Sequence, residues 1–210
     1  VALILLGGVT LAVVMARSGA RDRIADWLER LEPSGDRTIT ILLLVFGLTP
    51  LMEAGTGFGL GVVITAPLLV RLGLSPVKAV VAGLLGLVLV PWGSLAPGTL
   101  VAAELGGVDF GDLGLWSALL TLPVLLVSTA AVLVVLGRRP TPGLLAVAAM
   151  VVVVQWGALV AANLTMGTPP AGVLSAAAVI ALLLTLIRVR HGALPPPDRE
   201  LTRALLPYAV

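Results

Sequence analysis

The sequence has no cysteine and very little charge, and each absence narrows the possible classes of protein. Without cysteine, disulfides, thiolate nucleophiles and cysteine-ligated metal sites are excluded. Charged residues make up 11% of the 210 residues and hydrophobic residues 59%, whereas a typical soluble domain is roughly 25% charged. Because so few charges cannot cover a surface that faces water, the sequence predicts a protein whose outer surface faces lipid.

The sequence also lacks the motifs of common enzyme classes and of nucleic-acid-binding proteins. It contains no H-E-x-x-H zinc motif, no G-x-S-x-G nucleophile motif and no Walker phosphate loop. The net charge is only +2, and no basic patch interleaved with aromatic residues marks a nucleic-acid surface. The single His191 stands beside a proline run, which suits a solvated loop. We therefore expect no enzyme, no metal, no cofactor and no nucleic-acid partner.

What the sequence does contain is a series of long apolar runs separated by clusters with uneven numbers of basic residues. The counts of Lys and Arg are five in Arg17–Arg37, two in Arg71–Lys78, none in Glu104–Gly114, two at Arg138–Arg139, none in Asn163–Pro170 and four in Arg188–Arg203. Basic loops stay on the cytoplasmic side, so the rich clusters are expected inside and the empty ones outside. The sequence predicts an all-α polytopic protein of a cytoplasmic membrane. The preference for Arg over Lys indicates a GC-rich bacterial genome, so we expect the membrane to be the bacterial inner membrane.

The clusters divide the chain into segments of one transmembrane transport domain. Val1 lies inside an apolar run and another run begins near Val210, so we expect a fragment. The predicted segments are a truncated transmembrane helix at 1–16, an interfacial amphipathic helix at 20–32, a re-entrant hairpin at 39–72, a broken transmembrane helix at 77–103, transmembrane helices at 115–137, 143–162 and 171–188, and a cytoplasmic loop with the start of a further span at 189–210.

The interfacial helix is predicted from the spacing of its apolar residues. Ile24, Trp27, Leu28 and Leu31 stand at i, i+3, i+4 and i+7, with charged residues elsewhere. This pattern is typical of an amphipathic helix that lies in the membrane interface. An ordinary connecting helix in solvent is the alternative.

The re-entrant hairpin is predicted from a conflict between charge and length. Arg37 and Arg71 both belong to cytoplasmic clusters, although the stretch between them is strongly apolar. Its arms, Ile39–Met52 and Val62–Leu72, would be about 21 and 16 Å long at 1.5 Å per residue, which is short of the ~30 Å hydrocarbon core. A hairpin that enters and leaves on the cytoplasmic side satisfies both observations, with its tip at Glu53–Gly61.

The next span is predicted to be discontinuous. Two prolines and two glycines fall within Val90–Gly98, and such a stretch disfavours a continuous helix. We expect Val77–Leu89 and Leu100–Ala103 to be helical, and Pro91–Gly98 to be largely non-helical and close to Gly55–Gly59.

Glu53 is the first candidate functional residue, because it is the only acidic residue between Asp36 and Glu104. A charged side chain at the centre of a bilayer costs about 2.5 to 3.5 kcal/mol on the insertion scale. An intramembrane carboxylate is therefore a candidate proton relay, cation ligand or lock on the hairpin. The structural alternative is that Glu53 only ties the tip to backbone N–H groups or to a cation.

Glycines and hydroxyls at the two interruptions complete the candidate site. Glycines allow a close approach of backbone to a ligand, and helices that begin after each interruption would direct partial positive charge at an anion. Tight helix packing is the alternative explanation for the glycines. The candidate substrate-binding residues are Glu53, Gly55, Thr56, Gly57, Phe58, Gly59, Gly93, Ser94 and Thr99.

The run Pro50–Gly59, followed by Val63–Pro76, resembles the L-lactate permease family. That family has a leucine-glutamate-glycine motif, then two residues, then glycine-phenylalanine-glycine; Glu53, Gly57, Phe58 and Gly59 match it. The resemblance is weaker through Trp92–Gly93, Leu122–Pro123 and the later spans. Ala54 stands where the family usually has glycine, and Gly86 where it usually has asparagine.

The resemblance implies uptake of lactate and glycolate coupled to protons. Sodium is the alternative coupling ion. It also implies relationship to an ion-transporter superfamily in which a hairpin and a broken helix move by an elevator mechanism, so that this chain would be the first inverted repeat. The lipid bilayer and a small monocarboxylate are the expected partners, and a homodimer is left open. The alternatives are a carrier of another anion, such as a dicarboxylate, and a membrane-embedded subunit that transports nothing.

Overall fold

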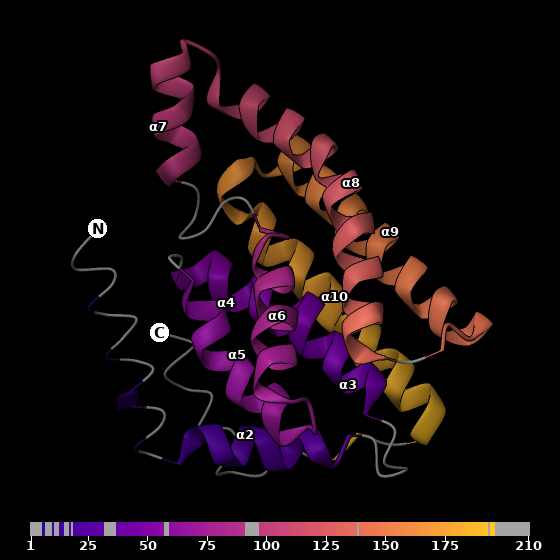
Figure 1. Ribbon diagram of the computed structural model, residues 1–210. Coiled ribbons are helices and arrows are strands. Elements are labelled where there is room, and N and C mark those ends of the chain that lie inside the picture. Colours follow the sequence, from indigo (N-terminus) through magenta and orange to yellow (C-terminus); the bar gives the residue numbers. More distant parts are fainter. Residues whose placement is uncertain are drawn as a thin grey trace.

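The computed structural model describes residues 6, 10, 13, 14, 17, 19–31, 37–56, 59–90, 97–137, 139–192, 194 and 195. Every regular element in this part of the chain is a helix, as Figure 1 shows. Four of the described helical stretches are long and apolar enough to cross a membrane. The predicted all-α polytopic class is therefore confirmed. Most of the predicted span at 1–16 and most of 189–210 lie outside the described residues.

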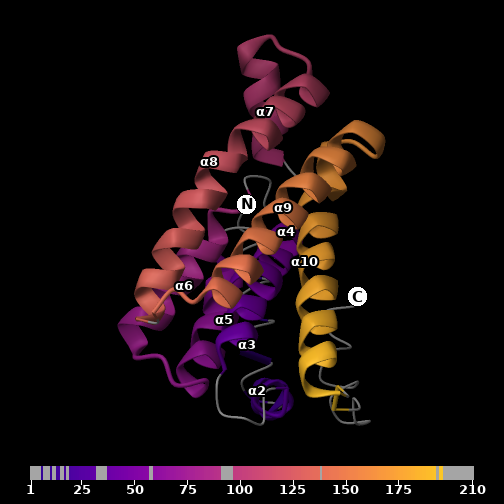
Figure 2. The same cartoon turned by 90° about the vertical axis from the view of Figure 1, so that its right-hand side faces the viewer.

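Three long helices pack side by side: α8 (Phe110–Leu136), α9 (Pro142–Thr165) and α10 (Thr168–His191) (Figure 2). They start five, one and three residues earlier, respectively, than the sequence led us to expect. One reason is that Asp109 caps α8, because its carboxylate accepts from the N–H groups of Gly111 and Asp112 at 2.8 and 3.0 Å. The prediction that His191 lies in a loop was wrong, since α10 continues through it to Gly192.

The hairpin region forms two antiparallel arms. The first arm is one continuous helical stretch made of α3 (Thr38–Leu42), the π-helix η1 (Leu43–Leu48) and α4 (Thr49–Thr56). The second arm is α5 (Leu60–Arg71). The ends meet where Nη1 of Arg37 donates to the carbonyl of Arg71 at 3.2 Å.

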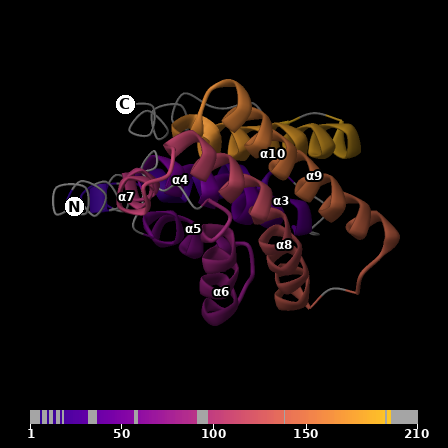
Figure 3. The ribbon, with the colours of Figure 1, turned by 90° about the horizontal axis from the view of Figure 1, so that it is seen from above.

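The first arm is longer than predicted, because it extends to Thr56 and not only to Met52. Its stretch Thr38–Gly55 is long enough to cross a membrane, and 78% of it is buried inside the protein, against 28 to 39% for the most apolar windows of the other three long helices. Figure 3 shows this arm between α10 on one side and α5 and α6 on the other. At 12 residues, α5 is only about 18 Å long.

The broken span consists of α6 (Pro76–Leu87) and α7 (Pro97–Gly106). The helix resumes at Pro97 and not at Leu100 as predicted. The first turn of a helix tolerates proline, because the N–H that proline lacks has no partner there. Of the stretch Pro91–Gly98 that was expected to be largely non-helical, Pro97 and Gly98 are helical, whereas 91–96 and their expected proximity to the hairpin tip lie outside the described residues. α7 packs against the start of α8 (Figure 1).

The helix α2 (Ala20–Glu29) lies across the open end of the hairpin, roughly perpendicular to its arms (Figure 1). Ile24, Ala25, Leu28 and Leu31 are buried, and they belong to the same core cluster as Leu68, Leu69 and Leu72 of the hairpin. The amphipathic pattern in the sequence thus corresponds to a helix whose apolar face packs on protein.

Candidate functional site

The hairpin tip contains a buried carboxylate. Glu53 lies in the last turn and a half of α4, and only 6% of its surface is exposed. Its neighbour Ala54 is buried beside it at 1%. A carboxylate in such surroundings must be paired or hydrogen-bonded, since desolvation of an unpaired charge is costly.

The partners of Glu53 are backbone N–H groups at the start of α5. The N–H of Gly59 donates to Oε1 at 3.1 Å, and the N–H of Gly61 donates to Oε2 at 3.3 Å. The first N–H groups of any helix have no partner within the helix, and the helix dipole favours negative charge at this end. Glu53 thus acts as a cap on α5 supplied by the preceding helix, and Gly59 reaches it from a left-handed conformation with φ of 82°.

The close contact between the two arms requires glycine at position 61. A Cβ there would lie 2.6 Å from the carbonyl oxygen of Thr49 and 3.3 Å from Cβ of Glu53. Around the place where a Cβ of Gly55 would be, by contrast, no described atom outside its own helix backbone and chain neighbours lies within 4 Å. The alternative of tight packing is therefore correct for Gly61, whereas Gly55 faces open space.

Two buried threonines, neither of them predicted from the sequence, join the arms one turn below Glu53. The hydroxyl oxygens of Thr49 and Thr65 are 2.8 Å apart, and neither residue is exposed. Each hydroxyl also reaches a carbonyl oxygen of its own helix, Thr49 that of Leu44 at 2.9 Å and Thr65 that of Gly61 at 2.8 Å. Their positions in the sequence could have indicated the pairing. In a hairpin with its tip at residue 57, residues 49 and 65 lie opposite each other, and so do residues 53 and 61.

The rest of the protein holds the first arm at equally close contacts. A Cβ at Gly86 of α6 would collide with the carbonyl oxygen of Val45 in η1, and one at Gly47 would lie 2.6 Å from Cγ1 of Ile180 in α10. A Cβ at Gly172 would lie 3.3 Å from that of Ala54. Any side chain larger than that of glycine at position 86 would therefore require a shift of η1.

Only some of the other predicted substrate-binding residues belong to the described part of the chain. Gly55 and Thr56 end α4, next to the tip, and Thr99 lies half-buried in the first turn of α7. The structure joins Glu53 to Gly59 by a hydrogen bond. Gly57, Phe58, Gly93 and Ser94 lie outside the described residues.

The N–H groups at the start of α5 bind a different carboxylate from the one expected. The sequence led us to expect that its N–H groups bind the carboxylate of a substrate. Two of them already bind the Glu53 carboxylate. The tip is therefore an anion site whose occupant, in this conformation, is the protein's own side chain.

Comparison with known proteins gives one family. The model of the family described as L-lactate permease matches residues 1–192 of the 210-residue chain. Neither a curated protein nor a solved structure matches the chain.

Proposed function

The chain belongs to the L-lactate permease family, and we propose that it carries small monocarboxylates such as lactate and glycolate across the bacterial cytoplasmic membrane in symport with a proton. Membership of this family makes it a multi-pass membrane transporter of the lactate-permease type. The observation that supports the finer proposal is the buried carboxylate of Glu53 on two backbone N–H groups at the hairpin tip.

The proton dependence follows from the number of acceptors that Glu53 offers. An ionised carboxylate accepts at both oxygens, whereas a protonated carboxyl group turns one oxygen into a donor. Protonation removes the negative charge and makes the hydroxyl oxygen a poorer acceptor, so the two bonds to Gly59 and Gly61 would weaken. The ionised form therefore keeps the tip closed, and the protonated form loosens it.

The substrate carboxylate would then accept hydrogen bonds from the N–H groups of Gly59 and Gly61, which protonated Glu53 releases. A backbone N–H at a helix N-terminus suits a carboxylate, and a monocarboxylate needs no further cation if a proton neutralises Glu53. One proton goes onto the Glu53 carboxylate as one substrate carboxylate replaces it at the start of α5. The pair crosses as a neutral combination, and deprotonation of Glu53 on the other side expels the substrate.

The movement that carries this site across the membrane is also a proposal. We take the hairpin of α3 to α5 as re-entrant from the cytoplasmic side, with α5 too short to span, and as part of an elevator-type moving unit. Gly57, Phe58, Gly93, Ser94 and Thr99 are proposed to complete the substrate site, and Gly55 and Thr56 to border it.

The test is uptake by membrane vesicles that contain the intact protein. Labelled L-lactate should accumulate when an inward proton gradient is imposed, and a protonophore should abolish the accumulation. Unlabelled glycolate should compete and succinate should not. Competition by succinate would favour a dicarboxylate carrier, dependence on a sodium gradient would replace the proton, and absence of any uptake would favour a subunit that transports nothing.

A further inference from the structure

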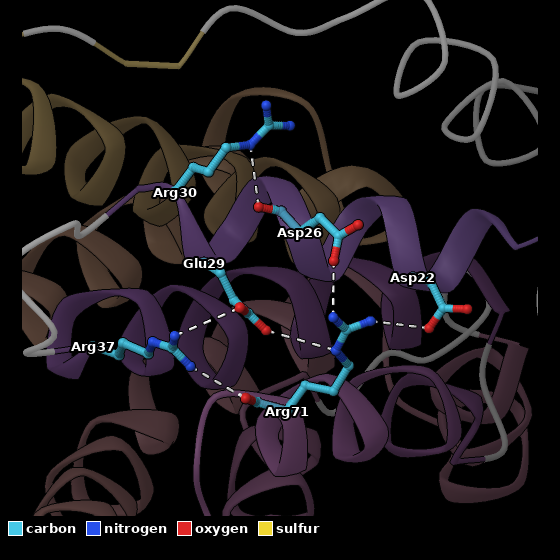
Figure 4. A network of polar contacts seen from close by, with 6 residues as sticks. All are labelled: Asp22, Asp26, Glu29, Arg30, Arg37 and Arg71. Carbon is cyan, nitrogen blue, oxygen red and sulfur yellow. Dashed lines mark hydrogen bonds and ion pairs between the residues drawn. The ribbon is translucent and has the colours of Figure 1, made fainter.

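The open end of the hairpin carries a second polar cluster, which the proposed function does not use. Arg71, the last residue of α5, contacts three carboxylates of α2 with three different nitrogens: Nη1 lies 3.0 Å from Asp22, Nη2 2.8 Å from Asp26 and Nε 3.6 Å from Glu29 (Figure 4). The three acids stand at i, i+4 and i+7, so they form one stripe along α2.

The same stripe reaches the beginning of the hairpin. Nη2 of Arg37 lies 3.5 Å from Oε2 of Glu29, and its Nη1 donates to the carbonyl oxygen of Arg71 (Figure 4). Glu29 therefore connects both ends of the hairpin to one position of α2. We call the five residues Asp22, Asp26, Glu29, Arg37 and Arg71 the base clamp.

Two further contacts fix α2 in this place. Its apolar face is buried in the core cluster that contains Leu68, Leu69 and Leu72. On another side, Nε1 of Trp27 donates to the carbonyl oxygen of Pro195 at 3.1 Å. Because the guanidinium is a rigid planar fork, contact with three carboxylates also sets the rotation of α2 about its own axis.

We propose that α2 and the α3–α5 hairpin form one rigid unit, in which the base clamp stays closed throughout transport. An individual exposed ion pair contributes little, but the clamp acts together with a buried apolar face that would have to enter water if the two parted. Any displacement of the hairpin must therefore carry α2 with it, by the same distance and in the same direction. This inference rests on the proposed function only in assuming that the hairpin moves.

A covalent tether between α2 and α5 tests the proposal. The chain has no cysteine, so the pair Asp22→Cys and Val70→Cys can be linked by a flexible bifunctional thiol reagent in the intact protein. This pair leaves Arg71 with Asp26 and Glu29. We expect ready crosslinking, and labelled lactate uptake by the linked protein within about twofold of the unlinked variant, because a tether inside a rigid unit restrains no movement that transport requires. A linked protein that no longer transports, or a pair that does not crosslink, would overturn the rigid unit.

The design separates this inference from the proposed function. Lactate uptake by the unmodified protein is measured first, and its absence counts against the function alone. The rate of crosslinking is then compared with and without an imposed proton gradient, which needs no knowledge of the substrate. A rigid unit gives the same rate, and a rate that depends on the gradient contradicts it. The pair Asp22→Cys and Arg30→Cys, both on α2, shows any effect of the reagent itself.

Discussion

The two ends of the hairpin are closed by different chemistry. At the tip, Glu53, Thr49 and Thr65 are buried, and their partners are largely backbone atoms. At the base, the side chains of Arg71 and Asp22 are 39% and 69% exposed, and the contacts are ion pairs. A buried hydrogen bond lies in a low dielectric and is hidden from salt, whereas exposed charges are screened within a Debye length of about 10 Å at 0.1 M. The contribution of the tip contacts to stability should therefore not change with salt concentration, whereas the contribution of the ion pairs at the base should fall as salt is added.

The largest effect is expected where the two arms touch at the tip. Gly61→Ala places a Cβ 2.6 Å from a backbone oxygen, which cannot rotate away. We expect a loss of about 3 kcal/mol of stability, at the upper end of the range for overpacking, together with loss of lactate uptake. Thermal unfolding of the purified protein in detergent measures the first and vesicle uptake the second. Gly157→Ala, within α9, is the matched control, because no described atom outside the backbone of its own helix lies within 4 Å of where its Cβ would be. Equal effects of the two variants would contradict the close contact.

The next effect concerns the charge of Glu53. Glu53→Gln keeps one acceptor oxygen but sets an N–H₂ group against a backbone N–H, so it imitates the protonated side chain. We expect a cost of about 2 kcal/mol, as for one hydrogen bond to a charged group. Exchange of labelled lactate across the membrane should persist, while accumulation driven by a proton gradient is lost. Loss of both exchange and accumulation would mean that Glu53 only braces the tip. Full accumulation would mean that Glu53 neither carries the proton nor braces the tip.

A smaller effect is expected at the threonine contact. Thr49→Val and Thr65→Val keep the shape of each side chain and remove its hydroxyl, and each should cost about 1 kcal/mol. The double variant should cost less than the sum, because the two hydroxyls are partners at 2.8 Å. Thr185→Val, whose hydroxyl donates to Ala181 on an exposed face, is the control. All of these differences should be the same at low and high salt, and a salt dependence would count against a buried contact.

The smallest effect is expected at the base. Arg71→Lys keeps one charge but cannot offer three nitrogens to three carboxylates, so at low salt it should lower stability by about 1 kcal/mol or less. In 1 M salt, where the Debye length is about 3 Å, the difference should vanish. Arg190→Lys, at the exposed end of α10, should change nothing at either concentration. A difference at Arg71 that survives 1 M salt would contradict the contrast between base and tip.

The sequence predicted the parts of this arrangement that depend on composition and on the order of charges. It placed Arg37 and Arg71 on one side, and the structure joins them by a hydrogen bond. It identified Glu53 as the unusual carboxylate, because a single acid in a long apolar run is visible without any knowledge of the fold. It also indicated a helix at α2 from the spacing of Ile24, Trp27, Leu28 and Leu31.

The partners of these residues could not be predicted, because they depend on contacts between distant segments. Arg71 binds Asp22 and Asp26, which are 49 and 45 residues away, and nothing in the sequence pairs them. The acids of α2 were treated as the polar face of a surface helix. In the same way, the glycines of the tip Glu53–Gly61 were expected to face a ligand, whereas only the position of Thr49 shows that Gly61 is a packing glycine.

The π-helix has a consequence for insertions and deletions. In η1 (Leu43–Leu48) the hydrogen bonds run from i to i+5, which makes room for an additional residue within an otherwise α-helical arm. Loss of one residue there can be absorbed by a return to α-helix, with α3 and α4 keeping their relative phase. The same loss within α4 or α5 would rotate everything beyond it by about 100°, since a turn takes 3.6 residues, and Glu53 would no longer face Gly61. Length variation in this arm should therefore be confined to the six residues of η1.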